Sequence, residues 1–422
     1  MLSLENIAER YAEGIADAWI AKMFKQCFMS TFETTAQRDS DGSYFVITGD
    51  IPAMWLRDSS AQVNHYVKFA DVCPQAYDLI LGLLRRQVQC ILTDAYANAF
   101  NREANGAGHQ GDKTQQSPYI WERKYEVDSL CYPIRLAYRF WKEANTSEHF
   151  TPELHLALNV ILDLWTTEQS HEHSSYSFER FGCPPSDTLL FGGTGTPVGY
   201  TGMTWSGFRP SDDACKYGYL VPANMFASVV LSYMEEIAEE IYSDTALARR
   251  AHTLNDEIKL GIEKFAIVPH EKFGLMYAYE IDGLGNYNLM DDANVPSLLA
   301  APYLGYCSKN DELYQNTRRF VLSTDNPFYY SGAAAQGVGS PHTPSNHVWP
   351  IALCMQGLTA NTVEEMDAVI HTLTSTDADT GFMHESFHVD DPKTFTRPWF
   401  SWANTLFAEL IMKRIDERGE MK

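Results

Sequence analysis

Apolar residues recur at helical spacing through most of the chain. In residues 4–28, Ile7, Tyr11, Ile15 and Trp19 lie four residues apart, which gives a helix one apolar face. The same periodicity predicts eleven further helices, over residues 60–70, 74–97, 128–145, 151–170, 222–242, 244–264, 296–304, 309–322, 348–359, 362–374 and 401–415. The pattern therefore predicts an all-α protein.

The segments between these helices alternate between long and short. The long loops cover residues 45–58, 100–125, 171–219, 267–295, 324–347 and 377–400, and residues 267–295 have room for a hairpin. Successive antiparallel helices place all long loops at one end. We therefore predict an (α/α)₆ barrel of six helical hairpins, with the long loops leading into the inner, even-numbered helices. The alternative, a helical-repeat solenoid, would need a recurring sequence period, and none is evident.

Composition limits the class of partner. A chain of 422 residues that is 45% hydrophobic can bury a large core, and no segment resembles a linker, so we predict one catalytic domain over residues 1–422. With 55 acidic and 32 basic residues the net charge is −23, which argues against nucleic acid or an anionic membrane as partner. A neutral ligand fits better. The sequence gives no indication of oligomeric state.

The first 29 residues lack the features of a signal peptide, and no run of about 18 apolar residues is present, so we expect a soluble, cytoplasmic protein. Eight cysteines are scattered without a Cys-x-x-Cys pair. This spacing favours neither a zinc ribbon nor a small disulfide scaffold. We expect the thiols to be reduced and mostly buried.

The six long loops carry many carboxylates, arginines and aromatic rings. Carboxylates and guanidinium groups hydrogen-bond hydroxyls, and aromatic rings cover the C–H face of a sugar. These loops therefore predict a pocket for a neutral, polyhydroxylated ligand. In chain order the candidate residues are Trp55, Arg57 and Asp58; Trp121, Glu122, Arg123, Glu126 and Asp128; Trp205, Arg209, Asp212 and Asp213; Asp291, Asp292 and Asn294; Asn346, His347 and Trp349; and His384, Glu385, His388, Arg397 and Trp399.

Each cluster taken singly also allows a structural role. Trp55 and Trp349 could be core aromatics at helix starts. Arg57 and Asp58 could form a local ion pair in which Asp58 caps a helix. The acidic pair at 291–292 could be a solvated turn. Convergence of six clusters on one end of a barrel favours a site.

Metal and phosphate sites are less well supported. His384 and His388 have the spacing of a helical zinc pair, but Pro392 disfavours a helix there. Residues 291–294 supply oxygen ligands suited to calcium without an EF-hand loop. The glycine-rich segment 192–196 lacks the lysine of a phosphate-binding loop. We predict no metal and no cofactor.

Acid–base chemistry by two carboxylates remains. Two adjacent acids, Asp212 and Asp213, raise the cost of ionising both, so one could stay protonated, while Arg209 acts in the opposite direction. Either of them, together with Glu385 from the last long loop, makes the best pair. Two carboxyl groups across a sugar pocket are what glycoside hydrolysis requires.

Four segments resemble the signature segments of glycoside hydrolase family 125: IPAMWLRDS at 51–59, GMTWSGFRPSDDA at 202–214, SNHVWP at 345–350 and GFMHESF at 381–387. The resemblance extends essentially from end to end. It implies an (α/α)₆ barrel and a metal-independent, inverting exo-α-1,6-mannosidase. Transferred to this chain, the general acid falls on Asp212, with Asp213 less favoured, and the general base on Glu385.

An inverting enzyme needs a water between its two carboxyl groups, so their separation should be about 6.5 to 9.5 Å, against about 5 Å in a retaining enzyme. We further expect polar side chains to hold the hydroxyls of the sugar and tryptophans to pack against its faces. The candidate substrate-binding residues are Trp55, Arg57, Asp58, Trp205, Arg209, Asn346, His347 and Trp399.

Two other classes of function stay open. An isomerase or epimerase on the same barrel would use histidines for proton transfer at a sugar carbon, and His347, His384 and His388 are available. A catalytically silent glycan-binding protein would keep the aromatic residues and need neither carboxylate.

Overall fold

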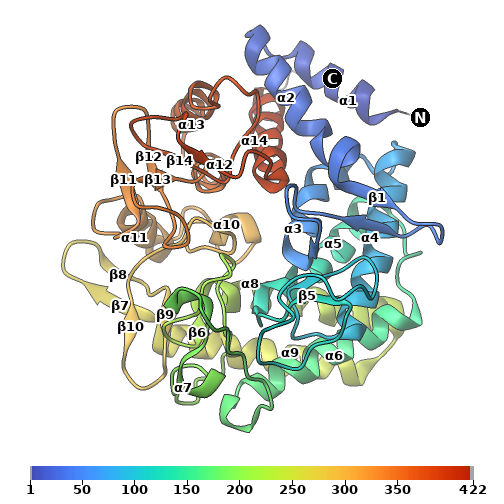
Figure 1. Cartoon of the computed structure of the whole chain (residues 1–422), viewed down its shortest axis with the longest axis vertical. Helices are drawn as coiled ribbons and strands as arrows, with labels where there is room; N and C mark the ends of the chain where they lie inside the picture. The colour runs from blue at the N-terminus through green and yellow to red at the C-terminus, as the bar shows by residue number, and fades with distance from the viewer. Residues whose placement is uncertain (1, 419–422) are drawn as a thin grey trace.

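The computed structural model describes residues 2–418, in which the helices form an (α/α)₆ barrel (Figure 1). Along the inner ring, contacts join α3 to α5, α5 to α8, α8 to α10, α12 to α14, and α14 back to α3. They correspond to every second one of the twelve predicted helices, starting from the second, and these are the helices that the sequence placed on the inside of the barrel. The inner helices are α3 (Leu56–Val63), α5 (Val127–Ala144), α8 (Val221–Ile237), α10 (Ala301–Leu304), α12 (Pro350–Leu358) and α14 (Ser401–Arg418).

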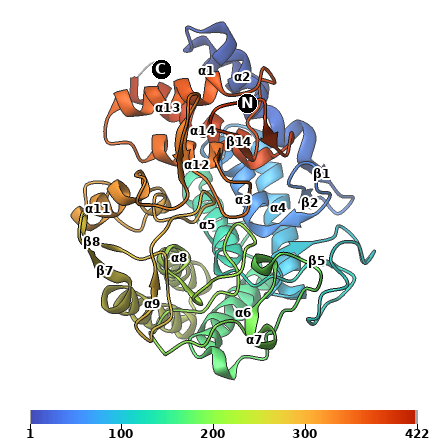
Figure 2. The same cartoon turned by 60° about the vertical axis from the view of Figure 1, so that its left-hand side comes forward.

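The outer helices cover this ring, with α2, α4, α9 and α13 packing on α14, α5, α8 and α12. The outer layer consists of α1 (Leu4–Glu13), α2 (Ala18–Ser30), α4 (Pro74–Thr93), α6 (Pro152–Glu168), α9 (Thr245–Gly261), α11 (Glu312–Val321) and α13 (Val363–Ser375). Tyr11 of α1 donates a hydrogen bond to Asp416 of α14 at 2.9 Å, so the first and last helices lie near one another (Figures 1 and 2).

Single turns of other helix types extend or connect these helices. π-Helical turns follow α2, α8 and α9, at Thr31–Thr35, Ala238–Tyr242 and Ile262–Ala266. A 3₁₀ segment, Asn64–Phe69, continues α3, and two more, His171–His173 and Pro185–Asp187, lie in the third long loop with the short α7 (Leu190–Gly193).

Three of the predicted helices were wrong in extent. The helix predicted over 60–70 begins at Leu56, so Arg57 and Asp58 lie in α3 and not in the preceding loop. Residues 4–28 form two helices, because Gly14 ends α1 and the Asp17 carboxylate accepts the amide hydrogens of Trp19 and Ile20 at the start of α2. The helix predicted over 296–304 is confined to Ala301–Leu304. Pro302 lies in its first turn, where a proline is tolerated, whereas in the longer helix it would be interior.

Small antiparallel sheets, which the sequence did not predict apart from one hairpin, lie in the loops. Three have three strands, in the orders β3-β4-β5, β10-β9-β6 and β13-β14-β15. The pairs are β1-β2, β11-β12 and β7-β8, and the last is the hairpin expected within residues 267–295. The strands are β1 (Ala36–Arg38), β2 (Tyr44–Val46), β3 (Met54–Trp55), β4 (Ala99–Phe100), β5 (Ile120–Glu122), β6 (Tyr219–Leu220), β7 (Ile267–His270), β8 (Gly274–Tyr277), β9 (Glu280–Ile281), β10 (Tyr287–Asn288), β11 (Tyr329–Ser331), β12 (Gln336–Val338), β13 (His347–Val348), β14 (Ser386–His388) and β15 (Phe395–Thr396).

These sheets hold the starts of inner helices. Strands β3 and β6 run directly into α3 and α8, and Trp349 alone separates β13 from α12. Pairing of Trp55 with Ala99, and of His347 with His388, fixes the backbone just before two of these helices. The side chains at the helix starts are thereby held by loops that are distant in sequence.

The main hydrophobic core extends from Leu4 to Ile415, and Ala53, Trp55 and Ala99 form a small separate cluster. All eight cysteines are free; Cys183 and Cys307 are partly exposed and the other six are buried, as expected from the sequence. Among residues 2–418, no helix combines the length and apolar character needed to cross a bilayer.

Candidate active site

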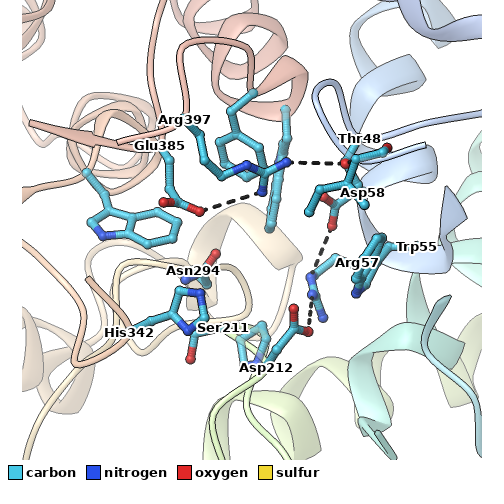
Figure 3. Close-up of a pocket in the computed structure, with 15 residues that line it drawn as sticks. Thr48, Trp55, Arg57, Asp58, Ser211, Asp212, Asn294, His342, Glu385 and Arg397 are labelled. Carbon is cyan, nitrogen blue, oxygen red and sulfur yellow. Dashed lines mark hydrogen bonds and ion pairs between the residues drawn. The ribbon is translucent and has the colours of Figure 1, made fainter. Parts of the chain in front are cut away.

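Five of the six long loops and the start of α14 enclose a cavity with about 390 Å³ of empty space, including its mouth (Figure 3). The lining residues are Thr48, Ile51, Trp55, Arg57, Asp58, Pro210, Ser211, Asp212, Asn294, His342, Trp349, Glu385, Arg397, Phe400 and Trp402.

One wall is built around the buried guanidinium of Arg57, in the first turn of α3. Its Nη1 lies 2.5 Å from Glu126 Oε2 and 3.1 Å from Asp128 Oδ2, both at the start of α5. Its Nη2 lies 3.3 Å from Asp212 Oδ1, and its Nε lies 3.4 Å from Asp58 Oδ1 (Figure 3). The predicted ion pair with Asp58 is thus confirmed as part of a larger group, in which one cation faces four carboxyl groups.

Asn98 and Lys124 complete this wall from the second loop. The amide nitrogen of Asn98 lies 3.3 Å from Glu126 Oε1 and 3.2 Å from Asp212 Oδ1. Lys124 Nζ donates to the backbone oxygen of Asp212 at 2.7 Å. Asp212 has a φ of 65°, a left-handed conformation that is uncommon outside glycine and that aspartate and asparagine adopt more readily than most other residues. Backbone and side-chain contacts together hold its carboxyl group at the cavity.

Burial and charge separate the acidities of these groups. Burial acts to raise the pKa of Asp212, but Arg57, a hydrogen bond with Glu126, and the charges of Lys124 and His342 hold it well below its usual range. Burial raises the pKa of Glu126 well above its usual range, and Arg57 offsets this only in part. The pKa values of Asp58 and Asp128 are raised to about 6, again mainly by burial.

Asp213 is placed differently from its neighbour. It is 4% exposed and does not line the cavity, and its Oδ1 lies 3.2 Å from Nδ1 of His342. Burial would lower the pKa of His342, but the hydrogen bond and charge of Asp213, with the charges of Asp212 and Glu385, raise it to about 9. Of the two adjacent acids, Asp212 is therefore the one that faces the cavity.

The opposite wall carries Glu385, immediately before β14, and Arg397, immediately after β15. Arg397 Nη1 lies 3.6 Å from Glu385 Oε1, and its Nε and Nη2 bond Asp50 and Thr48 at 2.9 and 3.3 Å. Figure 3 shows Glu385 and Asp212 on opposite sides of the cavity. Glu385 and Asp212 thus face one cavity from loops that are far apart in sequence.

Several expected sugar contacts lie elsewhere. Trp205 is 1% exposed and stacks on His171 with ring centroids 3.5 Å apart, so it is a core aromatic and we no longer place it against the substrate. Arg209 is also absent from the lining, because its Nε bonds Glu280 at 2.6 Å.

Residues Asn346, His347 and Trp399 are likewise outside the lining. His347 is held in β13 by pairing with His388, and its Nδ1 bonds the backbone oxygen of Ser345 at 3.1 Å. Asn346 has a φ of 63° and accepts the amide hydrogen of Val389 through its backbone oxygen. Trp399, which is 37% exposed, flanks the lining residue Phe400.

The acidic pair at 291–292 is not a solvated turn, because both side chains are almost fully buried. Asp291 accepts the amide hydrogens of Leu298 and Leu299, and burial raises its pKa to about 8. Asp292 accepts a hydrogen bond from the cavity residue Ser211 at 2.9 Å. The pair therefore supports the loop beneath the cavity.

Sequence reasoning missed His342, Ser211, Asn98 and the aromatic residues Phe400 and Trp402. His342 follows a proline in a loop rich in glycine, serine and proline, close to the SNHVWP segment, which was a usable signal. The sequence around Asn98 gave no such signal, because the role of Asn98 depends on a contact with Asp212 that only the fold creates.

Both histidines of the pair considered for zinc make ring contacts with other side chains. His384 stacks on Phe395 with centroids 3.7 Å apart, and His388 packs against His347. In the described part of the chain, no three His, Cys, Asp or Glu side chains are grouped so as to hold a metal ion.

Comparison with known proteins identifies relatives over nearly the whole length. A family model described as metal-independent α-mannosidase (GH125) matches residues 17–412. The meiotically up-regulated gene 157 protein of Schizosaccharomyces pombe is 36% identical over 99% of this chain and 87% of its own.

A solved structure from Streptococcus pneumoniae, a metal-independent α-mannosidase in a non-productive complex with α-1,6-mannobiose, has a TM-score of 0.95 and 48% identity over 98% of this chain and 97% of that one. A wild-type glycosidase, at 11% identity and a TM-score of 0.58 over 94% of this chain and 97% of its own, shares the fold.

Proposed function

Because the chain belongs to the metal-independent α-mannosidases of glycoside hydrolase family 125, we propose that it is an inverting exo-α-1,6-mannosidase that releases terminal mannose from α-1,6-linked mannosides. The whole chain would act as one catalytic domain on a neutral oligosaccharide, without a metal or cofactor. The α-1,6 linkage is suggested by the mannobiose bound to the Streptococcus pneumoniae relative.

The observation that carries this proposal is the pair of carboxylates facing each other across one small cavity, Asp212 and Glu385 (Figure 3). Protonated Asp212 donates to the glycosidic oxygen, so that the leaving sugar departs as a neutral alcohol. Glu385 accepts a proton from a water that attacks the anomeric carbon from the opposite face. One displacement inverts the anomeric centre, provided that the carboxyl groups are far enough apart to admit the water.

Exo action is supported by the buried lining of the cavity. Arg57 and Trp402, which both line it, are each 2% exposed, so the site suits a chain end rather than the middle of a polymer. Trp55 and Trp349 are placed to pack against the sugar, and Asp58, Ser211 and Asn294 to bond its hydroxyls. Trp399 lies beside this lining and suits the leaving sugar. The histidines on which an isomerase would depend, His347, His384 and His388, do not line the cavity.

Proton NMR of the first turnovers tests this function directly. With α-1,6-mannobiose as substrate, the anomer formed first should be β-mannose, because a single displacement inverts the centre. The α-1,2- and α-1,3-linked isomers serve as matched controls and should be cleaved much more slowly. Early release of α-mannose would rule out inversion, and absence of free mannose from all three would rule out the mannosidase assignment.

A further inference from the structure

The wall around Arg57 holds more negative charge than its cations can balance. We call Asp58, Glu126, Asp128 and Asp212 the carboxylate cluster; the exposed fractions of their side chains are 8%, 0%, 0% and 24%. Each of these four carboxyl groups has an oxygen within 3.4 Å of a guanidinium nitrogen of Arg57. An unpaired buried carboxylate is costly, and a crowded group of acids lowers this cost by keeping a proton. The geometry therefore implies that the cluster holds at least one proton at neutral pH.

Other charged groups around the cluster do not remove this excess. The charge of Arg397 acts on Asp58, but Arg397 bonds Asp50 at 2.9 Å and lies 3.6 Å from Glu385. Lys124 interacts with Asp212, but its Nζ also pairs with Asp187 and lies 3.6 Å from Glu122. Glu122 in turn accepts a hydrogen bond from Asn98 at 3.1 Å and another from Arg180 at 2.8 Å.

On the cavity side, His342 faces Asp212 and is paired with Asp213. Glu126 also lies near the thiol of Cys215, whose pKa is raised well above its usual range by burial. Neither group neutralises Glu126, because His342 is committed to Asp213 and the thiol carries no charge.

The shared proton has a preferred position. Glu126 Oε2 accepts from Arg57 at 2.5 Å and from Ser129 Oγ at 2.8 Å. The Asn98 amide nitrogen lies 3.3 Å from Glu126 Oε1 and 3.2 Å from Asp212 Oδ1, which makes the two carboxyl groups neighbours, and a hydrogen bond between them raises the pKa of Glu126 and lowers that of Asp212. The Glu126 side chain is completely buried, whereas Asp212 retains access to the cavity. Burial disfavours the charged form more strongly in the less accessible group. Asp128 is as buried as Glu126, but its pKa is raised only to about 6, so the proton rests on Glu126 while Asp212 is ionised.

We propose that Glu126 is the positioning residue that stores the proton which Asp212 delivers to the leaving oxygen. This inference rests on the proposed function. When a glycoside fills the cavity and excludes water from Asp212, the ionised form of Asp212 loses its solvation, and the proton moves along the shared hydrogen bond from Glu126 to Asp212. Asp212 then passes it to the glycosidic oxygen as the C–O bond breaks. Glu385 takes one proton from the attacking water, and exchange with solvent returns it to Glu126 after product leaves.

The variant Glu126→Gln tests this storage role. Its amide would donate to Asp212 and keep that carboxylate ionised, so protonation of the leaving group would fail. We expect kcat/KM on α-1,6-mannobiose to fall on the order of 10²-fold, while kcat/KM on a dinitrophenyl mannoside, whose leaving group needs no proton, falls less than about 3-fold. The loss on mannobiose should deepen as pH rises.

Glu122→Gln is the matched control, because Glu122 also accepts from Asn98 without a hydrogen bond to Asp212. It should affect both substrates equally. If Glu126 acts through Asp212, adding Glu126→Gln to Asp212→Asn should cause no further loss on mannobiose. Equal losses on both substrates for Glu126→Gln, no loss at all, or an additive double variant would overturn the inference.

The same substrates separate failure of the inference from failure of the proposed function. If Asp212→Asn itself lacks dependence on the leaving group, then the assignment of the acid fails. If it has this dependence and Glu126→Gln does not, only the storage role fails.

Infrared difference spectra keep the test decisive if Glu126→Gln does not fold. Subtracting the spectrum of Asp212→Asn from that of the resting wild type should leave the band of a carboxylate. The band of a carboxylic acid would place the proton on Asp212 and overturn the inference.

Discussion

The two walls of the cavity place a carboxyl group at the substrate in opposite ways. Asp212 belongs to a crowded wall, where four carboxyl groups surround the buried guanidinium of Arg57, and Asn98 donates to two of them, Glu126 and Asp212. Glu385 belongs to a sparse wall, where its cationic partner is Arg397 at 3.6 Å. Arg397 itself is partly exposed and is held by Asp50. Crowding retains protons, whereas a neighbouring cation favours the ionised form of a carboxyl group, which is the form that a general base needs.

This difference explains how one site can present an acid and a base made of the same functional group. The crowded wall draws its buried members from the starts of α3 and α5, and Asp212, which is partly exposed, comes from the third loop. Glu385 and Arg397 of the sparse wall flank the ends of β14 and β15 in the sheet β13-β14-β15. Environment rather than residue type assigns the role, and this makes the comparison testable by substitution.

The largest expected effect is loss of the two carboxylates themselves. Glu385→Gln should lose on the order of 10² to 10⁴-fold in kcat on both α-1,6-mannobiose and a dinitrophenyl mannoside, because every substrate needs the water activated. Asp212→Asn should lose a similar factor on mannobiose but keep substantial activity on the aryl mannoside, whose leaving group departs unprotonated. Steady-state kinetics on both substrates measures the contrast.

Asp213→Asn is the control within the acidic pair, since Asp213 is directed to His342 and away from the cavity. It should not make the loss depend on the leaving group. If it does and Asp212→Asn does not, the acid is Asp213 and the choice between these neighbours is wrong. Equal losses for Asp212→Asn on both substrates would remove the crowded wall from proton transfer.

The next effect concerns stability. Arg57→Gln removes the central cation of the crowded wall and leaves buried carboxylates uncompensated, which typically costs about 3 to 5 kcal/mol. Arg397→Gln removes a cation whose side chain is 21% exposed and whose partner Asp50 is 34% exposed, so we expect a loss of about 1 kcal/mol or less. Denaturant unfolding of both variants measures the free energies. Similar losses would contradict the distinction between the two walls.

Much of the barrel could be predicted from sequence because long amphipathic helices carry a strong periodic signal. The inner and outer assignment followed from alternating loop lengths, and contacts around the ring confirm it. The break between α1 and α2 was missed because apolar spacing continues across Gly14 and Asp17. Strands of two residues, such as β3 and β13, are too short to leave a pattern.

The sequence predicted which loops form the candidate site better than it predicted which side chains in those loops line the cavity. Arg57, Asp58, Asp212 and Glu385 do line one cavity. Trp205 shows why others do not, since a buried aromatic that stacks on His171 has the same residue type as one that faces a ligand. The placement of a side chain depends on its partners from other loops, and the spacing of residues along the sequence does not reveal these partners.

The smallest expected effect lies between the two walls, at His342. Its pKa is raised to about 9, because the hydrogen bond and charge of Asp213 and the charges of Asp212 and Glu385 outweigh burial. Because the pKa of His342 is higher in the folded than in the unfolded protein, its charge stabilises the fold fully below the unfolded pKa of about 6.5. This stabilisation is lost as pH rises through the folded pKa of about 9. Because 38% of the side chain is exposed, solvent screening should limit the contribution to about 1 kcal/mol. The difference in unfolding free energy between wild type and His342→Gln should therefore be largest near pH 6 and vanish near pH 10. A difference that stays constant over this range would mean that His342 contributes by packing, and that its charge does not link the two walls.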